Sequence, residues 1–318
     1  MDARRRRCLG PPAIGNSSCC LKKPAKTIKR IGIIANFTKG PARSVVQQAA
    51  RLIERSGRTV VTDAATAQLA RIKADLCLNI STLVKEVDVI LVVGGDGTML
   101  KAAREVNGSR TPLLGINVGA LGFLTDVSSS ELPEALEKVW LGSYALERRA
   151  LIEASGSTHG RPFRSVALNE FVISRHNISR LIELEASVDG QVLTRYRGDG
   201  LIISSPTGST AYSLAAGGAV VYPTAEVFLL TPICPHTLSS RSVIVDLRST
   251  VQVKVINQRP ETILSADGQN ESALLAGDVL TVRRSRHSVY LVHLTGTSFF
   301  ETLRRKLHWS GSNLTRLG

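Results

Sequence analysis

The sequence predicts two packed domains, an α/β domain with a doubly wound parallel sheet followed by an all-β, sandwich-like domain. The chain has 318 residues, about twice the ~100–200 residues of a typical domain. Its first half alternates apolar runs with amphipathic helical segments, whereas its second half consists of short alternating runs separated by turns. These observations place the boundary between the domains near Ser143 and exclude a small disulfide-stabilised protein.

Strands and helices alternate in the first half, as a parallel sheet requires. The most informative run, VDVILVV over 87–93, is continuously apolar and β-branched, which is typical of a parallel strand covered on both faces. Pro133 fits the first turn of a helix, because proline lacks the N–H that is unpaired there. The expected strands are 31–34, 59–62, 87–93 and 112–116, and the expected helices are 43–56, a helix from near Thr98 to about Val106, and one carrying Leu136, Val139 and Trp140.

The second half carries a strong hairpin signature. The alternating runs 181–188 and 191–196 are separated by Asp189-Gly190 alone, and this dipeptide favours a two-residue hairpin turn. Further strand-like runs are 243–247, 251–256, 278–284 and 289–294. The predicted division is a disordered basic tail (1–30), an N-terminal α/β domain (31–143), a C-terminal β-rich domain (144–295), and a helical segment (296–318) that packs back on the N-terminal domain.

Composition limits the functional classes. Most of the net charge of +14 lies in residues 1–30, so the body is too weakly basic to indicate nucleic-acid binding. No apolar run approaches the ~18–20 residues of a membrane span, and the tail lacks the apolar core of a secretory signal. The five cysteines have no C-x-x-C spacing, and the six histidines no zinc-binding spacing. We therefore expect a cytoplasmic protein without membrane or nucleic-acid partners.

The motif Gly94-Gly95-Asp96-Gly97-Thr98 lies between the apolar run and a helix. Its glycines let a ligand approach the backbone, and a helix N-terminus attracts phosphate. The motif is neither a Rossmann fingerprint nor a P-loop. An aspartate inside an anion-binding loop is explained if it acts on a hydroxyl as general base or orienter, or if it helps to hold a phosphate-bridging cation. The sequence therefore favours phosphoryl transfer over the alternative, an ordinary Asp-Gly turn.

A second group of polar residues spans Arg197 to Gly218. It places glycine, serine and threonine around one carboxylate and Tyr212, whose ring offers a flat surface to a base or ribose, although a Ser/Thr-rich turn has the same composition. Asn169-Glu170 supplies an amide and a carboxylate suited to a ribose diol. Asp267-Gly268-Gln269 is formally another turn and by itself indicates little.

Taken in order, these motifs resemble the NAD kinase family from about Ile31 to Trp309. The motif GGDG is shared with diacylglycerol and sphingosine kinases, so the resemblance depends on the ordered set rather than on one motif. The tail lies outside it. The matching segments are GGDGT (94–98), NVGALGFLT (117–125), NE (169–170), GDGLIISSPTGSTAY (198–212) and PICPHTLSSR (232–241).

The resemblance implies transfer of the γ-phosphoryl of ATP, with Mg²⁺ or another divalent cation, to the 2′-hydroxyl of the adenosine ribose of NAD. Asp96 matches the proton acceptor, and Gly94, Gly95 and Thr98 belong to the phosphate loop. Asp199 resembles a contact supplied by a neighbouring subunit of a dimer or tetramer, and Tyr222 stands where histidine is frequent. The positions expected to contact NAD are Gly97, Asn169, Glu170, Arg180, Arg197, Asp199, Thr210, Ala211, Tyr212, Ser213, Leu214, Ala215 and Gln269.

Two other functions remain compatible with the residues. A lipid kinase with the same GGDG loop would need an apolar access groove or a membrane-facing patch. A non-catalytic NAD or NADP sensor would need no general base, so the presence of Asp96 argues against it.

Overall fold

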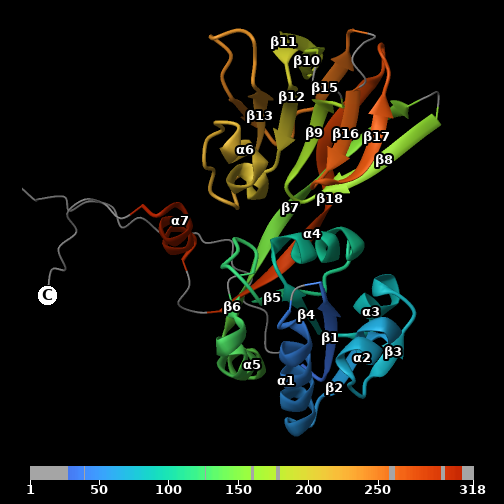
Figure 1. Ribbon diagram of the computed structural model, residues 1–318, viewed down its shortest axis with the longest axis vertical. Coiled ribbons are helices and arrows are strands. Elements are labelled where there is room, and N and C mark those ends of the chain that lie inside the picture. Colours follow the sequence, from blue (N-terminus) through green and yellow to red (C-terminus); the bar gives the residue numbers. More distant parts are fainter. Residues whose placement is uncertain are drawn as a thin grey trace, which may run out of the picture.

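The computed structural model describes residues 28–309, with gaps at 39, 126, 159–160, 177–179, 258–261 and 295–297, and without the side chains of 270 and 271. The expected disordered tail lies, up to residue 27, outside the described residues. Figure 1 shows an α/β part below and a β-rich part above, so the predicted fold class is confirmed. No helix in these described ranges has the length and apolarity needed to cross a membrane.

The α/β part contains a parallel sheet in the order β3-β2-β1-β4-β5, with β6 beside β5. Strand order reverses between β1 and β4, the place where doubly wound proteins bind ligands beyond the carboxyl ends of their strands. The strands are β1 (Arg30–Ala35), β2 (Thr59–Asp63), β3 (Asp75–Cys77), β4 (Val89–Gly94), β5 (Leu113–Asn117) and β6 (Val127–Ser128). The helices are α1 (Ala42–Arg55), α2 (Ala64–Ala70), α3 (Ile80–Glu86), α4 (Asp96–Glu105) and α5 (Leu132–Trp140), with a 3₁₀ turn η1 (Ser129–Glu131).

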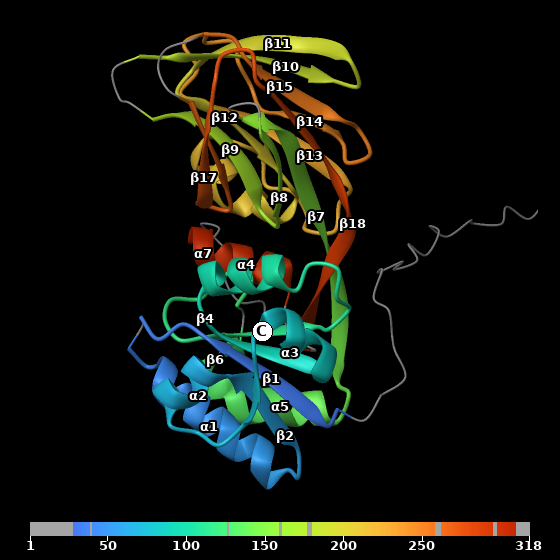
Figure 2. The ribbon, with the colours of Figure 1, turned by 90° about the vertical axis from the view of Figure 1, so that its right-hand side faces the viewer.

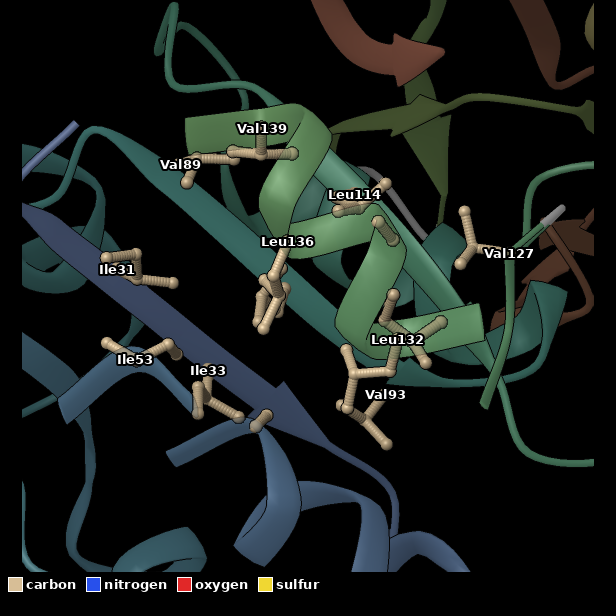
Figure 3. Packing of buried hydrophobic residues seen from close by; sticks show 14 of the residues in the cluster. Ile31, Ile33, Ile53, Val89, Val93, Leu114, Val127, Leu132, Leu136 and Val139 are labelled. Carbon is tan, nitrogen blue, oxygen red and sulfur yellow. The ribbon is translucent and has the colours of Figure 1, made fainter. Parts of the chain in front are cut away.

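Both faces of this sheet are buried, as the apolar run of β4 predicts. Val89, Leu91 and Val93 lie in one core with α1 and α5, whereas Ile90 and Val92 lie in another with α3 and α4. Figure 3 shows the first core, where side chains of β1, β4 and α5 meet. The alternation along β4 therefore fixes which helices cover which face.

The β-rich part is a sandwich with one shared core. Its antiparallel six-stranded sheet has the order β14-β13-β12-β9-β16-β17, and the facing strands extend the sheet of the α/β part. The six-stranded sheet comprises β9 (Glu170–Arg175), β12 (Gly200–Ser204), β13 (Val227–Ile233), β14 (Val243–Asp246), β16 (Thr262–Ala266) and β17 (Gln269–Leu274). The facing strands are β7 (Tyr144–Thr158), β8 (Arg161–Ala167), β10 (Ile182–Val188), β11 (Gln191–Gly198), β15 (Val251–Val255) and β18 (Val279–Leu294), while η2 (Thr207–Thr210) and α6 (Tyr212–Ala215) follow β12.

Two long strands join the parts into one twelve-stranded sheet (Figure 2). Strand β18 pairs with β5 at Leu291 and with β7 along most of its length. The two runs predicted at 278–284 and 289–294 are therefore one strand, interrupted by a bulge between Arg284 and Ser288. Alternation patterns break at a bulge, which explains why the sequence indicates two strands.

The turns follow the predicted chemistry, whereas one helix begins earlier than expected. Asp189 and Gly190 have φ of 50° and 81° and form the β10–β11 hairpin turn.

Helix α4 begins at Asp96, not near Thr98, because the Gly95 carbonyl already accepts the amides of Thr98 and Met99. The aspartate of the GGDG motif therefore lies in the first turn of a helix.

Helix α7 (Phe299–Leu307) contacts both parts of the molecule. The rings of Phe299 and Phe300 lie 5.4 and 5.8 Å from that of Tyr222, between α6 and β13. The Lys306 ammonium lies 5.6 Å from the ring of Phe123, in the segment after β5.

Candidate active site

The Asp96 carboxylate lies at the switch point of the parallel sheet. Strand β4 ends at Gly94, Gly95 is the N-cap of α4, and Asp96 follows in the first turn, where a negative charge is favourable to the helix dipole. A Cβ atom on Gly94 would lie 2.3 Å from Oγ1 of Thr98, so this tight strand-to-helix turn requires glycine. Gly97 is exposed on the same turn.

The segment 119–125 wraps around this carboxylate. Oδ1 of Asp96 accepts hydrogen bonds from the amides of Leu124 (3.0 Å) and Thr125 (3.2 Å) and from the Thr125 hydroxyl (3.1 Å). Oδ2 accepts one bond, from the amide of Phe123 at 2.8 Å. This segment is the GALGFLT part of the NVGALGFLT motif (117–125), and its hydrogen bonds hold the Asp96 carboxylate.

A cavity of about 950 Å³ opens beside the first turn of α4. Phe37 and Ile80 contribute apolar wall, and Lys101 contributes a positive charge beside the carboxylates of Asp63 and Glu105. Gly95, Gly97 and Thr98 line it, as does Gln269 from the β-rich part. An apolar wall next to a cation and a helix N-terminus suits a nucleotide with its phosphates.

Asn169 and Glu170 lie buried at the start of β9, with exposed fractions of 8% and 5%. Among the described residues, Asn169 Oδ1 and Glu170 Oε2 are buried oxygens that have no hydrogen-bond partner. Burial raises the pKa of the Glu170 carboxyl to about 8, with a further contribution from the negative charge of Asp267. Unpaired buried polar atoms are rare in folded proteins, so these two indicate a place for a ligand.

Asp267 organises this pair from the β16–β17 turn. Its carboxylate accepts the amides of Leu168 (3.0 Å), Asn169 (2.8 Å) and Glu170 (3.2 Å). Asp267 and Gly268 have φ of 50° and 67°, which confirms the predicted turn. The sequence did not reveal this role, because an Asp-Gly turn looks the same whether or not its carboxylate is used.

Arg104 links helix α4 to that turn. Its guanidinium forms an ion pair with Asp267 at 3.1 Å and hydrogen-bonds the side-chain oxygen of Gln269. Arg104 follows Asp96 by eight residues, about 12 Å along the helix axis. A single helix therefore connects the proposed base to the Asn169-Glu170 pair. Arg104 belongs to none of the motifs found in the sequence. Only its position on the helix face distinguishes it from other arginines.

The segment after β12 packs directly on Asn169. The amide of Ser205 donates to the Asn169 carbonyl at 2.8 Å, and a Cβ atom on Gly208 would lie 2.4 Å from the same oxygen. Thr210, Ala211, Leu214 and Ala215 follow in the same segment, and Tyr212 is 44% exposed. Ser213 is fully buried and its hydroxyl is engaged with Thr231 (2.9 Å).

Three predicted contact residues lie elsewhere in this chain. Asp199 pairs with Arg175 (2.9 Å), Arg197 lies 3.7 Å from Glu183, and Arg180 is exposed. Strand β12 separates them from the site, since Gly200 at its start pairs with Ser174 and Ser204 at its end pairs with Glu170. At about 3.3 Å per residue this distance is roughly 13 Å. One chain therefore does not bring all the predicted positions together.

Family models match both parts of the chain. The ATP-NAD kinase N-terminal domain matches residues 31–144, and the ATP-NAD kinase C-terminal domain matches residues 168–294. An NAD kinase of Symbiobacterium thermophilum is 41% identical over 87% of this chain and 98% of its own length. An NAD kinase of Cupriavidus pinatubonensis is 37% identical over 91% of this chain and 94% of its own.

Solved structures with ligands share the fold. A yeast NADH kinase complexed with NADH is 26% identical, with a TM-score of 0.82 over 92% of this chain and 90% of its own. An NAD kinase from Archaeoglobus fulgidus in complex with ATP is also 26% identical, with a TM-score of 0.69 over 88% of this chain and 98% of its own.

Proposed function

The chain belongs to the ATP-NAD kinase family, and on that premise we propose that it transfers the γ-phosphoryl of ATP to the 2′-hydroxyl of the adenosine ribose of NAD, giving NADP and ADP. The observation that carries this proposal is the pair of unpartnered buried oxygens on Asn169 and Glu170. In this arrangement the 3′-hydroxyl of the ribose donates to one of these acceptors, while the proton of the 2′-hydroxyl points to Asp96. The Arg104–Asp267 ion pair ties this pair to the helix that carries Asp96.

In the proposed reaction Asp96 is the general base. The ribose oxygen forms a bond to the γ-phosphorus, its proton passes to the Asp96 carboxylate, and the bond from that phosphorus to the β–γ bridging oxygen breaks. Oδ2 is the oxygen for this task, because Oδ1 already accepts three hydrogen bonds. The transition state is loose, so positioning should contribute more than base strength.

We propose that ATP binds in the cavity beside α4. We assign its phosphates to the first turn of that helix, at Gly95, Gly97 and Thr98, and Lys101 lines the same cavity. The described residues contain no group of three His, Cys, Asp or Glu side chains able to hold a metal ion. The phosphates of ATP would therefore supply most of the ligands of Mg²⁺, which neutralises charge on their oxygens when bound.

The remaining predicted contacts are assigned by their place in the fold. We propose that Gln269, Tyr212 and the rest of the segment 210–215 contact NAD from the same chain. Arg180, Arg197 and Asp199 lie about a strand length away from Glu170, so we propose that a second copy of the chain supplies them in a homodimer or homotetramer. We further propose a cytoplasmic location and the domain division 31–143, 144–295 and 296–318.

The test is NADP formation from NAD, ATP and Mg²⁺, measured with an NADP-specific dehydrogenase. We expect the unaltered protein to be active and Asp96→Asn to lose about 10²–10⁴-fold in kcat. Asp189→Asn is the matched control, because it makes the same chemical change in a distant hairpin turn whose backbone conformation asparagine also adopts. Full activity of Asp96→Asn would refute the assignment of the base, and absence of NADP from the unaltered protein would refute the proposed function.

A further inference from the structure

We propose that Thr125, supported by Asn117, is a positioning residue that holds Asp96 so that Oδ2 alone faces the substrate hydroxyl. This inference rests on the proposed role of Asp96 as general base. It concerns two residues that flank the phosphate loop in space but follow it in the chain by about 20 to 30 positions. Neither is among the residues assigned above to NAD or ATP.

The direction of each hydrogen bond is fixed by the backbone. Asn117 Nδ2 lies 2.7 Å from the carbonyl oxygen of Ala120 and 3.3 Å from that of Thr125, and Asn117 Oδ1 accepts the amide of Gly119 at 2.6 Å. These partners leave one orientation for the Asn117 amide group. Nδ2 also lies 3.1 Å from the Thr125 hydroxyl, which must accept there.

The Thr125 hydroxyl therefore directs its single proton at Asp96. Its distance to Oδ1 is 3.1 Å, and Oδ1 also faces the amides of Leu124 and Thr125. Three donors converge on Oδ1, so a proton added to the carboxylate has no place on that oxygen. Among the described residues, Oδ2 receives a hydrogen bond only from the amide of Phe123, and it retains acceptor capacity. The hydrogen bonds thus distinguish two chemically identical oxygens.

The surroundings hold this arrangement rigidly. Thr125 is fully buried and Asn117 is 4% exposed, so water has little access to the Thr125 end of these bonds. A Cβ atom on Gly122 would lie 1.9 Å from Oδ1 of Asp96 and 2.5 Å from Oγ1 of Thr125, so the backbone itself blocks rotation toward that side. Removing the hydroxyl would leave Oδ1 short of one donor and free the carboxylate to turn.

The test compares Thr125→Val, Thr125→Ser and Thr62→Val in steady-state kinetics and in calorimetric titration with NAD. Valine keeps the shape of threonine but removes the hydroxyl, whereas serine keeps the hydroxyl. Thr62 is the matched control, because it is also fully buried in the α/β part, but its hydroxyl donates to the Ile33 carbonyl at 2.7 Å, away from Asp96.

We expect Thr125→Val to lower kcat about tenfold to a hundredfold, the range for losing a hydrogen bond to a charged group. The KM and Kd for NAD should change less than about threefold, because the ribose contacts are untouched. Thr125→Ser should recover most of the lost kcat, and Thr62→Val should stay near the unaltered protein. If Thr125→Val does not fold, Thr125→Ala takes its place and is compared with the same Thr125→Ser variant.

Three outcomes would overturn the proposal while leaving the kinase activity in place. These are a Thr125→Val protein with unaltered kcat, a loss of kcat that serine does not recover, and a loss that appears equally in Thr62→Val. An unaltered protein that binds NAD but makes no NADP would instead refute the proposed function. The two failures are therefore distinguishable.

Discussion

The guanidinium of Arg104 and the carboxylate of Asp267 form an ion pair of 3.1 Å that joins helix α4 to the β16–β17 turn across the two parts of the molecule. The side chain of Asp267 has no exposed surface, and that of Arg104 is 12% exposed. Asp267 also accepts three backbone amides at the start of β9. The proposed base and the proposed ribose site are therefore coupled through one buried carboxylate.

Arg104→Ala should destabilise the protein strongly. Removing one partner of a buried pair leaves the other charge unpaired and costs about 3–5 kcal/mol. The measurement is the free energy of unfolding in urea. Arg248→Ala is the control, because Arg248 also pairs with an aspartate (Asp246, 2.7 Å), but with an 80% exposed side chain; it should change stability little. Equal effects of the two substitutions would contradict the coupling.

Glu170 should make stability fall as the pH rises. Burial, and then the charge of Asp267, raise the pKa of Glu170 from its usual value near 4.5 to about 8 in the folded protein. Between these values the folded state retains a proton that the unfolded state releases, so this contribution is complete below pH ~4.5 and is lost as the pH passes about 8. The measurement is the melting temperature from pH 5 to 9.

Glu170→Gln is the matching variant, because it mimics the protonated carboxyl at every pH. The difference in melting temperature between Glu170→Gln and the unaltered protein should therefore widen in favour of the variant toward pH 8–9. The contribution of Glu147 to stability depends on pH in the opposite direction, because its pKa is lowered in the folded protein. Burial raises its pKa, but the hydrogen bond from His293 and the charge of Arg149 outweigh this and lower it to about 2. Its contribution is lost only as the pH falls from about 4.5 toward 2, outside the measured range. A pH-independent difference would refute the assignment to Glu170.

Local patterns predicted most of the fold, while the site depended on contacts between distant residues. The structures of β4 and of the Asp189-Gly190 turn are determined by residues that are adjacent in the sequence, and both are as expected. Helices α2 and α3 were missed, because each has only seven residues and depends on a cap, Asp63 or Asn79. The use of Asp267 was not predictable, since its partners lie about 100 and 160 positions away in the chain.

Gly122→Ala should abolish most of the activity. The added Cβ atom would lie 1.9 Å from Oδ1 of Asp96, so the carboxylate or the segment 119–125 must move. We expect kcat to fall about a hundredfold or more, because small displacements of a catalytic group are costly. Gly40→Ala is the control, since no atom lies within 4 Å of its added Cβ atom. Retained kcat in Gly122→Ala would show that Asp96 is not confined as the distances indicate.

Tyr222→Ala should loosen the segment that holds Asp96, although Tyr222 does not touch it. Tyr222 packs against Phe299 of α7, and Lys306 of α7 lies over the ring of Phe123. Losing the aromatic contact, worth about 0.5–1.5 kcal/mol beyond burial, should detach α7 more often. Hydrogen exchange measured by mass spectrometry should then accelerate several-fold in peptides covering Phe123 to Thr125, whose amides bond Asp96. Tyr222→Phe preserves the ring and should exchange at the original rate, so acceleration in both variants, or in neither, would exclude α7 as the link.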